Sequence, residues 1–259
     1  MLSDSVAVEP AAVLHDLAGR TDRLGVAEED WLGGWRSADE RAAEALLGVL
    51  SRAGLSEPGV AAELGVLLPA GGTLFVASSM PVRDIEAFWP VRQDPPRVLC
   101  NRGANGIDGT VASAFGAAAG QSLRGTYGAV VLMIGDVALA HDIGSLIAAG
   151  RLQLKLTIVL LENAGGGIFD FLPVAKAESA REVYLEHVVT APELDFGRAA
   201  ALCGLEHVRP ETLPSFREAL EQALASEGST MIEVRSERAA NLELHREAWQ
   251  AAVAALEAP

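Results

Sequence analysis

Two short blocks, Gly135-Asp136 and Asn163-Ala164-Gly165-Gly166-Gly167, contain the groups best suited to chemistry in this sequence of 259 residues. They place a carboxylate and a side-chain amide 27 positions apart. Carboxylate oxygens, amide oxygens and the backbone carbonyls of a glycine turn are hard ligands that suit Mg²⁺. Because Mg²⁺ usually completes its shell with phosphates and water, the blocks predict a site for Mg²⁺ and a phosphate-bearing cofactor.

The segments before the two blocks predict how the blocks are brought together. Residues 129–134 and 155–161 are apolar runs ended by turn residues, as in buried parallel strands, and residues 138–149 between them have a helical pattern. Both blocks would then lie at the carboxyl edge of the sheet, where open α/β sheets bind ligands. An ordinary strand-end turn explains either block alone better than a site does, but it explains the pair poorly.

Strands and helices alternate along most of the chain, which predicts an α/β fold with an open, mostly parallel sheet and helices on both faces. Residues 1–30 have weak periodicity and are interpreted as a tail or linker, and residues 31–259 as one domain. Further strands are expected at residues 73–77, 97–100 and 231–234. Further helices are expected from Trp31 to a C-terminal Gly54 and at 58–68, 110–123, 196–203, 214–225 and 239–256, with 174–194 irregular.

Composition excludes several classes of function. The formal net charge is −15 and Lys and Arg do not cluster, so nucleic acid and anionic membranes are poor partners. Cys100 and Cys203 form no disulfide framework, and we expect both to be small core residues. The sequence has no signal-peptide pattern and no apolar run of about 18 residues, so we expect a cytoplasmic protein without membrane insertion.

The two blocks resemble the thiamine diphosphate motif, whose usual form is GDG followed at a distance by NN. Four blocks occur in the order typical of one family: SSMPVRD at 78–84, NRGANGIDG at 101–109, GDVALAHD at 135–142 and GGGIFDFLP at 165–173. Over roughly residues 64–235, the chain resembles the 2-succinyl-5-enolpyruvyl-6-hydroxy-3-cyclohexene-1-carboxylate synthases of menaquinone biosynthesis. These transferases decarboxylate 2-oxoglutarate and add the succinyl semialdehyde unit to isochorismate.

The resemblance implies thiamine diphosphate and Mg²⁺ (or Mn²⁺) as cofactors. It implies Asp136, Asn163 and Gly165 as metal ligands, the last through its carbonyl. Further cofactor contacts are implied for Ser79, Gly135, Ile107, Ile168 and Phe169. Ile107 matches the apolar wedge that bends the cofactor so that its pyrimidine amine meets its thiazolium carbon.

Arg83 and Arg102 match positions that would recognise the substrates. Both substrates carry carboxylates, and in a chain of charge −15 their binding requires local positive groups. Each site residue also has a plainer explanation. Asn163 suits a turn, Ile107, Ile168 and Phe169 suit core packing, Ser79 suits a helix N-cap, and the two arginines suit surface ion pairs.

The chain departs from the family pattern beside Asn163, where Glu162 and Ala164 replace polar neighbours that are commonly Asn or Asp. Ala164 removes no expected ligand. Glu162 adds negative charge near the metal, which leaves the affinity for the cofactor open.

The resemblance also implies a longer protein, about twice this length, that begins with a pyrimidine-binding domain followed by a middle domain. Residues 1–30 would be a remnant of the middle domain, and residues 31–259 the diphosphate-binding domain. The family's activating glutamate lies in the first domain, and no residue here matches it. We therefore expect the C-terminal half of a carboligase, inactive without the pyrimidine-binding half and part of a homo-oligomer.

Two alternatives remain open at this point. One is a noncatalytic remnant or binding module of the same fold. The other is the same half of another thiamine diphosphate enzyme, such as an acetolactate synthase, although the block at residues 101–109 argues against it.

Overall fold

The computed structural model describes residues 7–21, 29–102, 105–123 and 128–257. The chain divides into two compact units, Met1–Arg41 and Ala42–Pro259. In the first unit, helix α1 (Pro10–Ala18) lies within the segment interpreted as a tail, and helix α2 (Glu29–Ala53) begins. The division falls inside α2 rather than at residue 30. The assignment of residues 1–30 to another domain of a longer protein stays a prediction.

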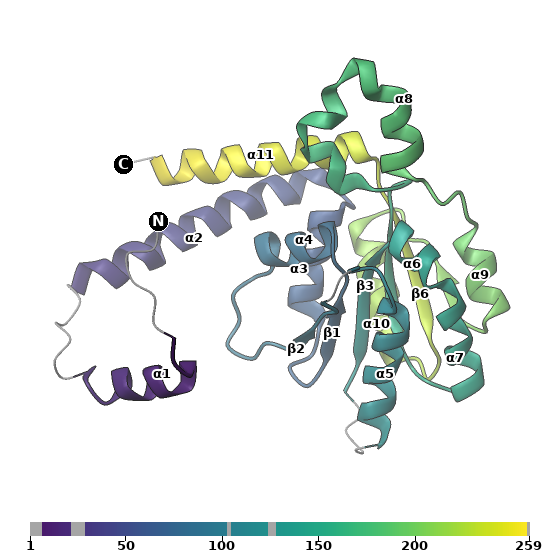
Figure 1. Ribbon diagram of the computed structural model, residues 1–259, viewed down its shortest axis with the longest axis horizontal. Coiled ribbons are helices and arrows are strands. Elements are labelled where there is room, and N and C mark those ends of the chain that lie inside the picture. Colours follow the sequence, from purple (N-terminus) through teal and green to yellow (C-terminus); the bar gives the residue numbers. More distant parts are fainter. Residues whose placement is uncertain (1–6, 22–28, 103–104, 124–127, 258–259) are drawn as a thin grey trace. The chain divides into compact units, whose positions relative to one another are not determined.

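The second unit is built on a parallel sheet of six strands in the order β2-β1-β3-β4-β6-β5. This confirms the predicted α/β fold (Figure 1). The strands are β1 (Thr73–Val76), β2 (Arg97–Leu99), β3 (Val130–Gly135), β4 (Thr157–Glu162), β5 (Glu206–Val208) and β6 (Thr230–Arg235). The strand β5 was not predicted, since its sequence Glu-His-Val contains a single apolar residue and no run that indicates a strand.

Alternate side chains of the central strands enter two separate cores. One core packs against the end of α2 and against α3 (Glu57–Leu67), α4 (Met80–Phe88), α10 (Leu213–Ala225) and α11 (Arg238–Glu257). The other packs against α5 (Thr110–Leu123), α6 (Asp136–His141), α7 (Ile147–Leu152) and α9 (Phe196–Leu202). In β3, for example, Val131 and Met133 enter the first core, whereas Leu132 and Ile134 enter the second.

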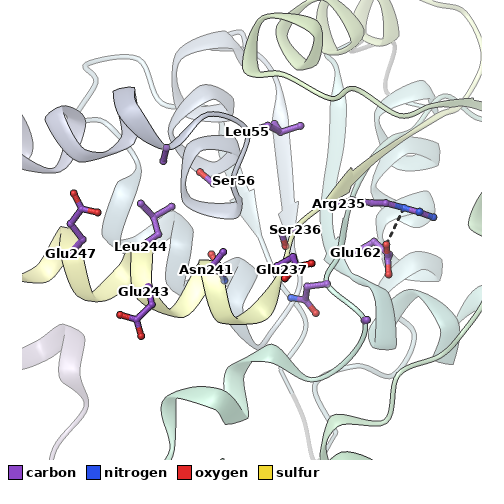
Figure 2. Close-up of a pocket in the computed structure, with 14 residues that line it drawn as sticks. Leu55, Ser56, Glu162, Arg235, Ser236, Glu237, Asn241, Glu243, Leu244 and Glu247 are labelled. Carbon is purple, nitrogen blue, oxygen red and sulfur yellow. Dashed lines mark ion pairs between the residues drawn. The ribbon is translucent and has the colours of Figure 1, made fainter.

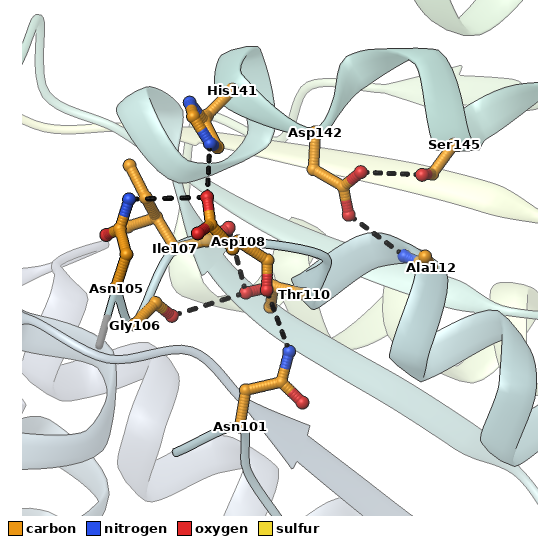
Figure 3. A network of polar contacts seen from close by, with 10 residues as sticks. All are labelled: Asn101, Asn105, Gly106, Ile107, Asp108, Thr110, Ala112, His141, Asp142 and Ser145. Carbon is orange, nitrogen blue, oxygen red and sulfur yellow. Dashed lines mark hydrogen bonds and ion pairs between the residues drawn. The ribbon is translucent and has the colours of Figure 1, made fainter. Parts of the chain in front are cut away.

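The helix predicted at residues 138–149 is interrupted, so this prediction was only partly right. A 3₁₀ turn, Ile143–Leu146, separates α6 from α7. The Asp142 carboxylate explains the interruption, because it accepts hydrogen bonds from the backbone N–H of Ala112 at 3.0 Å and from the Ser145 hydroxyl at 2.6 Å (Figure 3). It thereby caps the first turn of α5 and also holds the Ser145 side chain of the 3₁₀ turn.

The segment predicted to be irregular contains short helical turns. They are the 3₁₀ turns Pro173–Lys176 and Glu178–Ala180, helix α8 (Arg181–Tyr184) and a π turn, Leu185–Val189. The core assignment of Cys100 was wrong, because its side chain is exposed, and Cys203 is half-buried. Among the residues described, no helix is both long and apolar enough to cross a membrane.

Candidate functional site

A cavity of about 340 Å³ lies at the carboxyl ends of β1, β3 and β4. In the sheet, β2 lies next to β1 on one side and β3 lies next to it on the other, so the order of the strands reverses at β1. Open α/β sheets bind ligands at such a switch point. The cavity is lined by segments that follow each strand, including Ser79 after β1, Asp136 after β3 and Asn163 after β4. The structure therefore brings together the two blocks from which the prediction started.

Asp136 is the first residue of α6, is buried, and accepts hydrogen bonds from two backbone N–H groups. Its Oδ1 accepts a hydrogen bond from the Val137 N–H at 2.7 Å, and its Oδ2 accepts one from the Gly165 N–H at 2.8 Å. Burial raises the pKa of Asp136 to about 6, the two backbone N–H groups oppose this, and the charge of Glu162 adds to it. A carboxylate oriented in this way and short of compensating positive charge is suited to a cation.

Asn163 is buried and anchored on one side only. Its Nδ2 donates to Oε1 of Glu57 at 2.9 Å, whereas its Oδ1 is buried without a hydrogen-bond partner. Buried amide oxygens in proteins are nearly always paired. A metal ion is the kind of partner that would satisfy this oxygen.

Glu57 is a cavity residue that sequence reasoning missed. It follows the N-cap Ser56 at the start of α3 and is 1% exposed. Burial, and then the nearby charge of Asp84, raise the pKa of Glu57 to about 7, although hydrogen bonds from Ser236 and Asn163 lower it. Its only sequence signal was an acidic residue in the first turn of a helix, which ordinarily indicates a solvated cap.

The glycine turn after Asn163 allows the chain to approach another segment closely. Gly165 has φ of +129°, and a Cβ on it would lie 2.4 Å from the Val189 carbonyl oxygen, which accepts a hydrogen bond from the Gly166 N–H at 2.7 Å. Ala164 has φ of +59°, a conformation that asparagine tolerates better. A polar residue such as asparagine at this position would therefore favour the backbone conformation of the turn. It would not be needed as a metal ligand.

The other predicted cofactor contacts also line the cavity: Ser79, Ile107, Gly135, Ile168 and Phe169. Figure 3 shows how the turn that carries Ile107 is held against α6. Asp108 Oδ1 lies 2.6 Å from His141 Nε2 and accepts from Asn105 Nδ2 at 3.2 Å. The turn that carries Ile107 is thus tied to the helix that begins with Asp136.

The two predicted substrate arginines do not line the cavity. Arg83 is exposed on α4 and donates to the carbonyl of Ser79 at 2.7 Å, which places its guanidinium beside a lining residue. Arg102 is also exposed, and residues 103–104 beside it lie outside the described residues.

A larger groove of about 730 Å³ lies beside Asn163, between the start of α11, the end of α2 and the ends of β4 and β6 (Figure 2). Its lining includes the carboxylates of Glu162, Glu237, Glu243 and Glu247. These would repel a diphosphate, so the groove suits an anionic cofactor less well than the smaller cavity does. Glu162 is paired with Arg235 at 3.1 Å, which offsets part of the negative charge that it adds near the cavity.

A buried ion pair joins α4 to α11 and contacts the turn that carries Ile168 and Phe169. His245 Nε2 of α11 lies 2.8 Å from Asp84 Oδ1 of α4, and His245 Nδ1 lies 2.8 Å from the Asn241 carbonyl oxygen. Oxygen acceptors at both ring nitrogens favour the imidazolium ion. The ring also makes edge contacts with Phe88, Phe171 and Trp249. Since Phe171 ends the turn that carries Ile168 and Phe169, the pair connects α4 to the cavity wall.

The donor set fits a metal held jointly with a phosphate rather than by protein alone. Within the described ranges, no three His, Cys, Asp or Glu side chains are grouped to hold a metal ion. The cavity instead offers the carboxylate of Asp136, the unpaired amide oxygen of Asn163 and a glycine turn, while one oxygen of the second carboxylate, Glu57, is already engaged by Asn163 and Ser236. Mg²⁺ that retains water and phosphate ligands requires no more.

Comparisons with known proteins show which family the domain resembles. Residues 83–234 match the family model described as thiamine pyrophosphate enzyme, C-terminal TPP binding domain. The chain is 44% identical over 230 residues to a 2-succinyl-5-enolpyruvyl-6-hydroxy-3-cyclohexene-1-carboxylate synthase of Myxococcus xanthus, covering 87% of this chain and 38% of the relative. It is 45% identical over 232 residues to the enzyme of that name in Rubrobacter xylanophilus, covering 89% and 38%.

A solved structure shows the same fold. Benzoylformate decarboxylase from Polynucleobacter necessarius superposes with a TM-score of 0.58 at 20% identity, covering 70% of this chain and 33% of that protein. The chain therefore spans little more than a third of the length of these curated relatives and about a third of the solved structure.

Proposed function

Because the chain belongs to the thiamine pyrophosphate enzymes and carries their C-terminal cofactor-binding domain, we propose that it is the diphosphate- and Mg²⁺-binding part of a 2-succinyl-5-enolpyruvyl-6-hydroxy-3-cyclohexene-1-carboxylate synthase. The whole enzyme would decarboxylate 2-oxoglutarate and add the resulting succinyl semialdehyde unit to isochorismate. The observation that carries the proposal is the buried, unpartnered Asn163 Oδ1 in the cavity that Asp136 also lines. The curated relatives supply the choice of substrates.

In this proposal Asp136, Asn163 and Gly165 bind the metal through a carboxylate, an amide oxygen and a backbone carbonyl. Their role is to neutralise and orient the diphosphate of the cofactor. Bound thiamine diphosphate supplies the carbon nucleophile that the reaction needs. Gly135 and Ser79 line the cavity at the ends of β3 and β1 and would contact the cofactor there.

The apolar lining has a separate role in the proposal. Ile107 would support the cofactor from one side, and Ile168 and Phe169 would keep water out of the cavity. A dry wall favours charge-neutral forms of the reacting groups over separated ions. The activating carboxylate would come from the pyrimidine-binding part of the whole enzyme. Assembly as a homo-oligomer and a cytoplasmic location remain predictions from the sequence.

Turnover in the presence and absence of a pyrimidine-binding partner tests the proposal. The purified chain is supplied with thiamine diphosphate, Mg²⁺, 2-oxoglutarate and isochorismate, either alone or with the N-terminal part of a relative such as the Myxococcus xanthus enzyme. We expect product only with the partner. Product from the chain alone would contradict the divided site. Metal-independent cofactor binding together with no product in either case would favour a noncatalytic module.

Arg83→Ala and Arg102→Ala are each expected to lower kcat/KM of the reconstituted enzyme by about ten- to a hundredfold, which corresponds to roughly 1.5–3 kcal/mol for a lost charge-assisted hydrogen bond. The melting temperature should change little, because both side chains are exposed. Arg198→Ala, which removes an exposed arginine from α9, is the matched control. Unchanged kinetics in a destabilised Arg83 or Arg102 variant would show a structural role instead.

A further inference from the structure

We propose that Glu57 is a positioning residue that orients the amide of Asn163, so that its oxygen rather than its NH₂ group faces the metal. The inference rests on the proposed function, since it assigns a role within the same site. Glu57 lies 106 positions from Asn163 along the chain, and the family motif and the sequence analysis give it no role.

The hydrogen bonds of Glu57 leave Asn163 one favourable orientation. Oε1 of Glu57 accepts from Asn163 Nδ2 at 2.9 Å and from the Ser236 hydroxyl at 2.6 Å. An oxygen that receives two donors is an acceptor, and only the NH₂ side of an amide can satisfy it. The Asn163 Oδ1 must then point away from Glu57, which leaves it without a partner.

An asparagine without such an anchor can present either end of its amide. Oxygen and NH₂ are nearly equal in size, so packing alone does not distinguish the two orientations. The flipped amide would direct N–H donors at a cation, which they cannot bind. The Glu57 carboxylate therefore selects the orientation that can coordinate a metal before the metal arrives.

The backbone register places the parts of this anchor side by side. Glu162 of β4 pairs with Arg235 of β6, so Asn163 and Ser236 follow neighbouring strands at the same level. The Ser236 N–H also donates to the Glu162 carbonyl at 3.0 Å. Glu57 reaches both side chains from the first turn of α3, where the positive end of the helix stabilises a carboxylate.

A burial argument also supports a role beyond packing. Glu57 is 1% exposed, and its Oε2 has no hydrogen-bond partner. A buried acid with an unsatisfied oxygen reduces stability relative to a side chain that matches its surroundings. Its hydrogen bond to the proposed metal ligand Asn163 gives this unfavourable group a function. At other metal sites, carboxylates that hydrogen-bond a ligand orient that ligand in the same way.

The test is a titration of the folded protein with Mn²⁺ and thiamine diphosphate, in which free Mn²⁺ is measured by electron paramagnetic resonance. Glu57→Leu is expected to weaken Mn²⁺ binding by about ten- to a hundredfold. Glu57→Gln retains an acceptor oxygen and should stay within about fivefold of the unaltered protein. Glu63→Leu removes the other buried carboxylate of α3, which accepts from Arg217 rather than from Asn163, and is the matched control, with affinity unchanged within about twofold. Folded Glu57→Leu protein with unaltered affinity would overturn the inference.

A second pair of variants decides the matter if Glu57→Leu does not fold. Asn163→Asp sets two carboxylates against each other, and adding Glu57→Gln supplies an NH₂ group that can hold the new carboxylate. We expect Glu57→Gln to tighten Mn²⁺ binding at least about tenfold in the Asn163→Asp background but not in the unaltered protein. An equal effect in both backgrounds would leave Glu57 as a structural residue only.

Asp136→Ala in the same titration separates this inference from the proposed function. If Asp136→Ala abolishes metal binding while Glu57→Leu has no effect, only the role of Glu57 is wrong. If Asp136→Ala also has no effect, the proposed metal site itself is wrong.

Discussion

Replacing Asp136 with alanine is expected to abolish the metal-dependent binding of thiamine diphosphate. Asp136 supplies the carboxylate among the three proposed ligands, and the other two are neutral oxygens. Without it, neither the charge of the metal nor that of the diphosphate is adequately balanced in a low-dielectric cavity. Calorimetry with and without Mg²⁺ should show binding by the unaltered chain only when the metal is present, and no binding by Asp136→Ala.

Two further variants make the Asp136 experiment specific. Glu237→Ala removes a carboxylate that lines the neighbouring acidic groove and should bind as the unaltered chain does. Asp136→Asn should be nearly as defective as Asp136→Ala, because both carboxylate oxygens accept from backbone N–H groups and an NH₂ group would oppose one of them. Binding of the cofactor without metal, or by Asp136→Ala, would refute the site.

The binding should also depend on pH. Burial raises the pKa of Asp136 to about 6, and only the ionised form binds a metal. Metal-dependent affinity is therefore expected to weaken as the pH falls through about 6.

Breaking the buried Asp84–His245 pair is expected to lower the free energy of unfolding more than the other substitutions proposed for this chain. Both side chains are almost fully buried, at 1% and 2% exposed. Removing one partner leaves the other charge without compensation, which typically costs about 3–5 kcal/mol. Urea unfolding of Asp84→Ala and His245→Ala should show losses of this order. Replacing both partners should cost less than the sum of the two single losses.

A surface pair provides the matched control. Arg52 and Glu247 lie 3.2 Å apart with both side chains more than half exposed. Glu247→Ala is therefore expected to change the free energy of unfolding by at most about 1 kcal/mol. Equal effects at the exposed and the buried pair would contradict the importance of burial.

The pair also gives stability a definite dependence on pH. Burial alone would lower the pKa of His245, but the hydrogen bond and charge of Asp84, with the Asn241 carbonyl, raise it. The imidazolium therefore stabilises the fold fully below the unfolded pKa of about 6.5, and this contribution is lost as the pH rises through the higher folded pKa. Glu57, with its pKa raised to about 7, changes stability in the same direction. The free energy of unfolding should fall as the pH rises from about 5 to 8, and less so in His245→Ala.

Local patterns in the sequence determined the strands of the sheet other than β5, and the edge at which the candidate site lies. Continuous apolar runs such as residues 129–134 are typical of strands that are buried on both faces. The turn residues after these runs determine where the strands end. Since parallel strands end at one edge, Asp136 and Asn163 had to lie near each other once their strands paired. These steps depend on neighbours in the chain, which is why composition and spacing sufficed.

Only the tertiary structure decided which group holds Asn163, one of the proposed metal ligands, and which charged side chains pair in the interior. The contact of Glu57 with Asn163 spans 106 positions and that of His245 with Asp84 spans 161 positions. Neither has a local signal, because each depends on how α3 and α11 pack on the sheet. The split between α6 and α7 likewise results from Asp142 capping α5, a helix 30 residues earlier in the chain. Burial and hydrogen bonding between distant segments thus set the charge and orientation of residues whose types and spacing the sequence had already indicated.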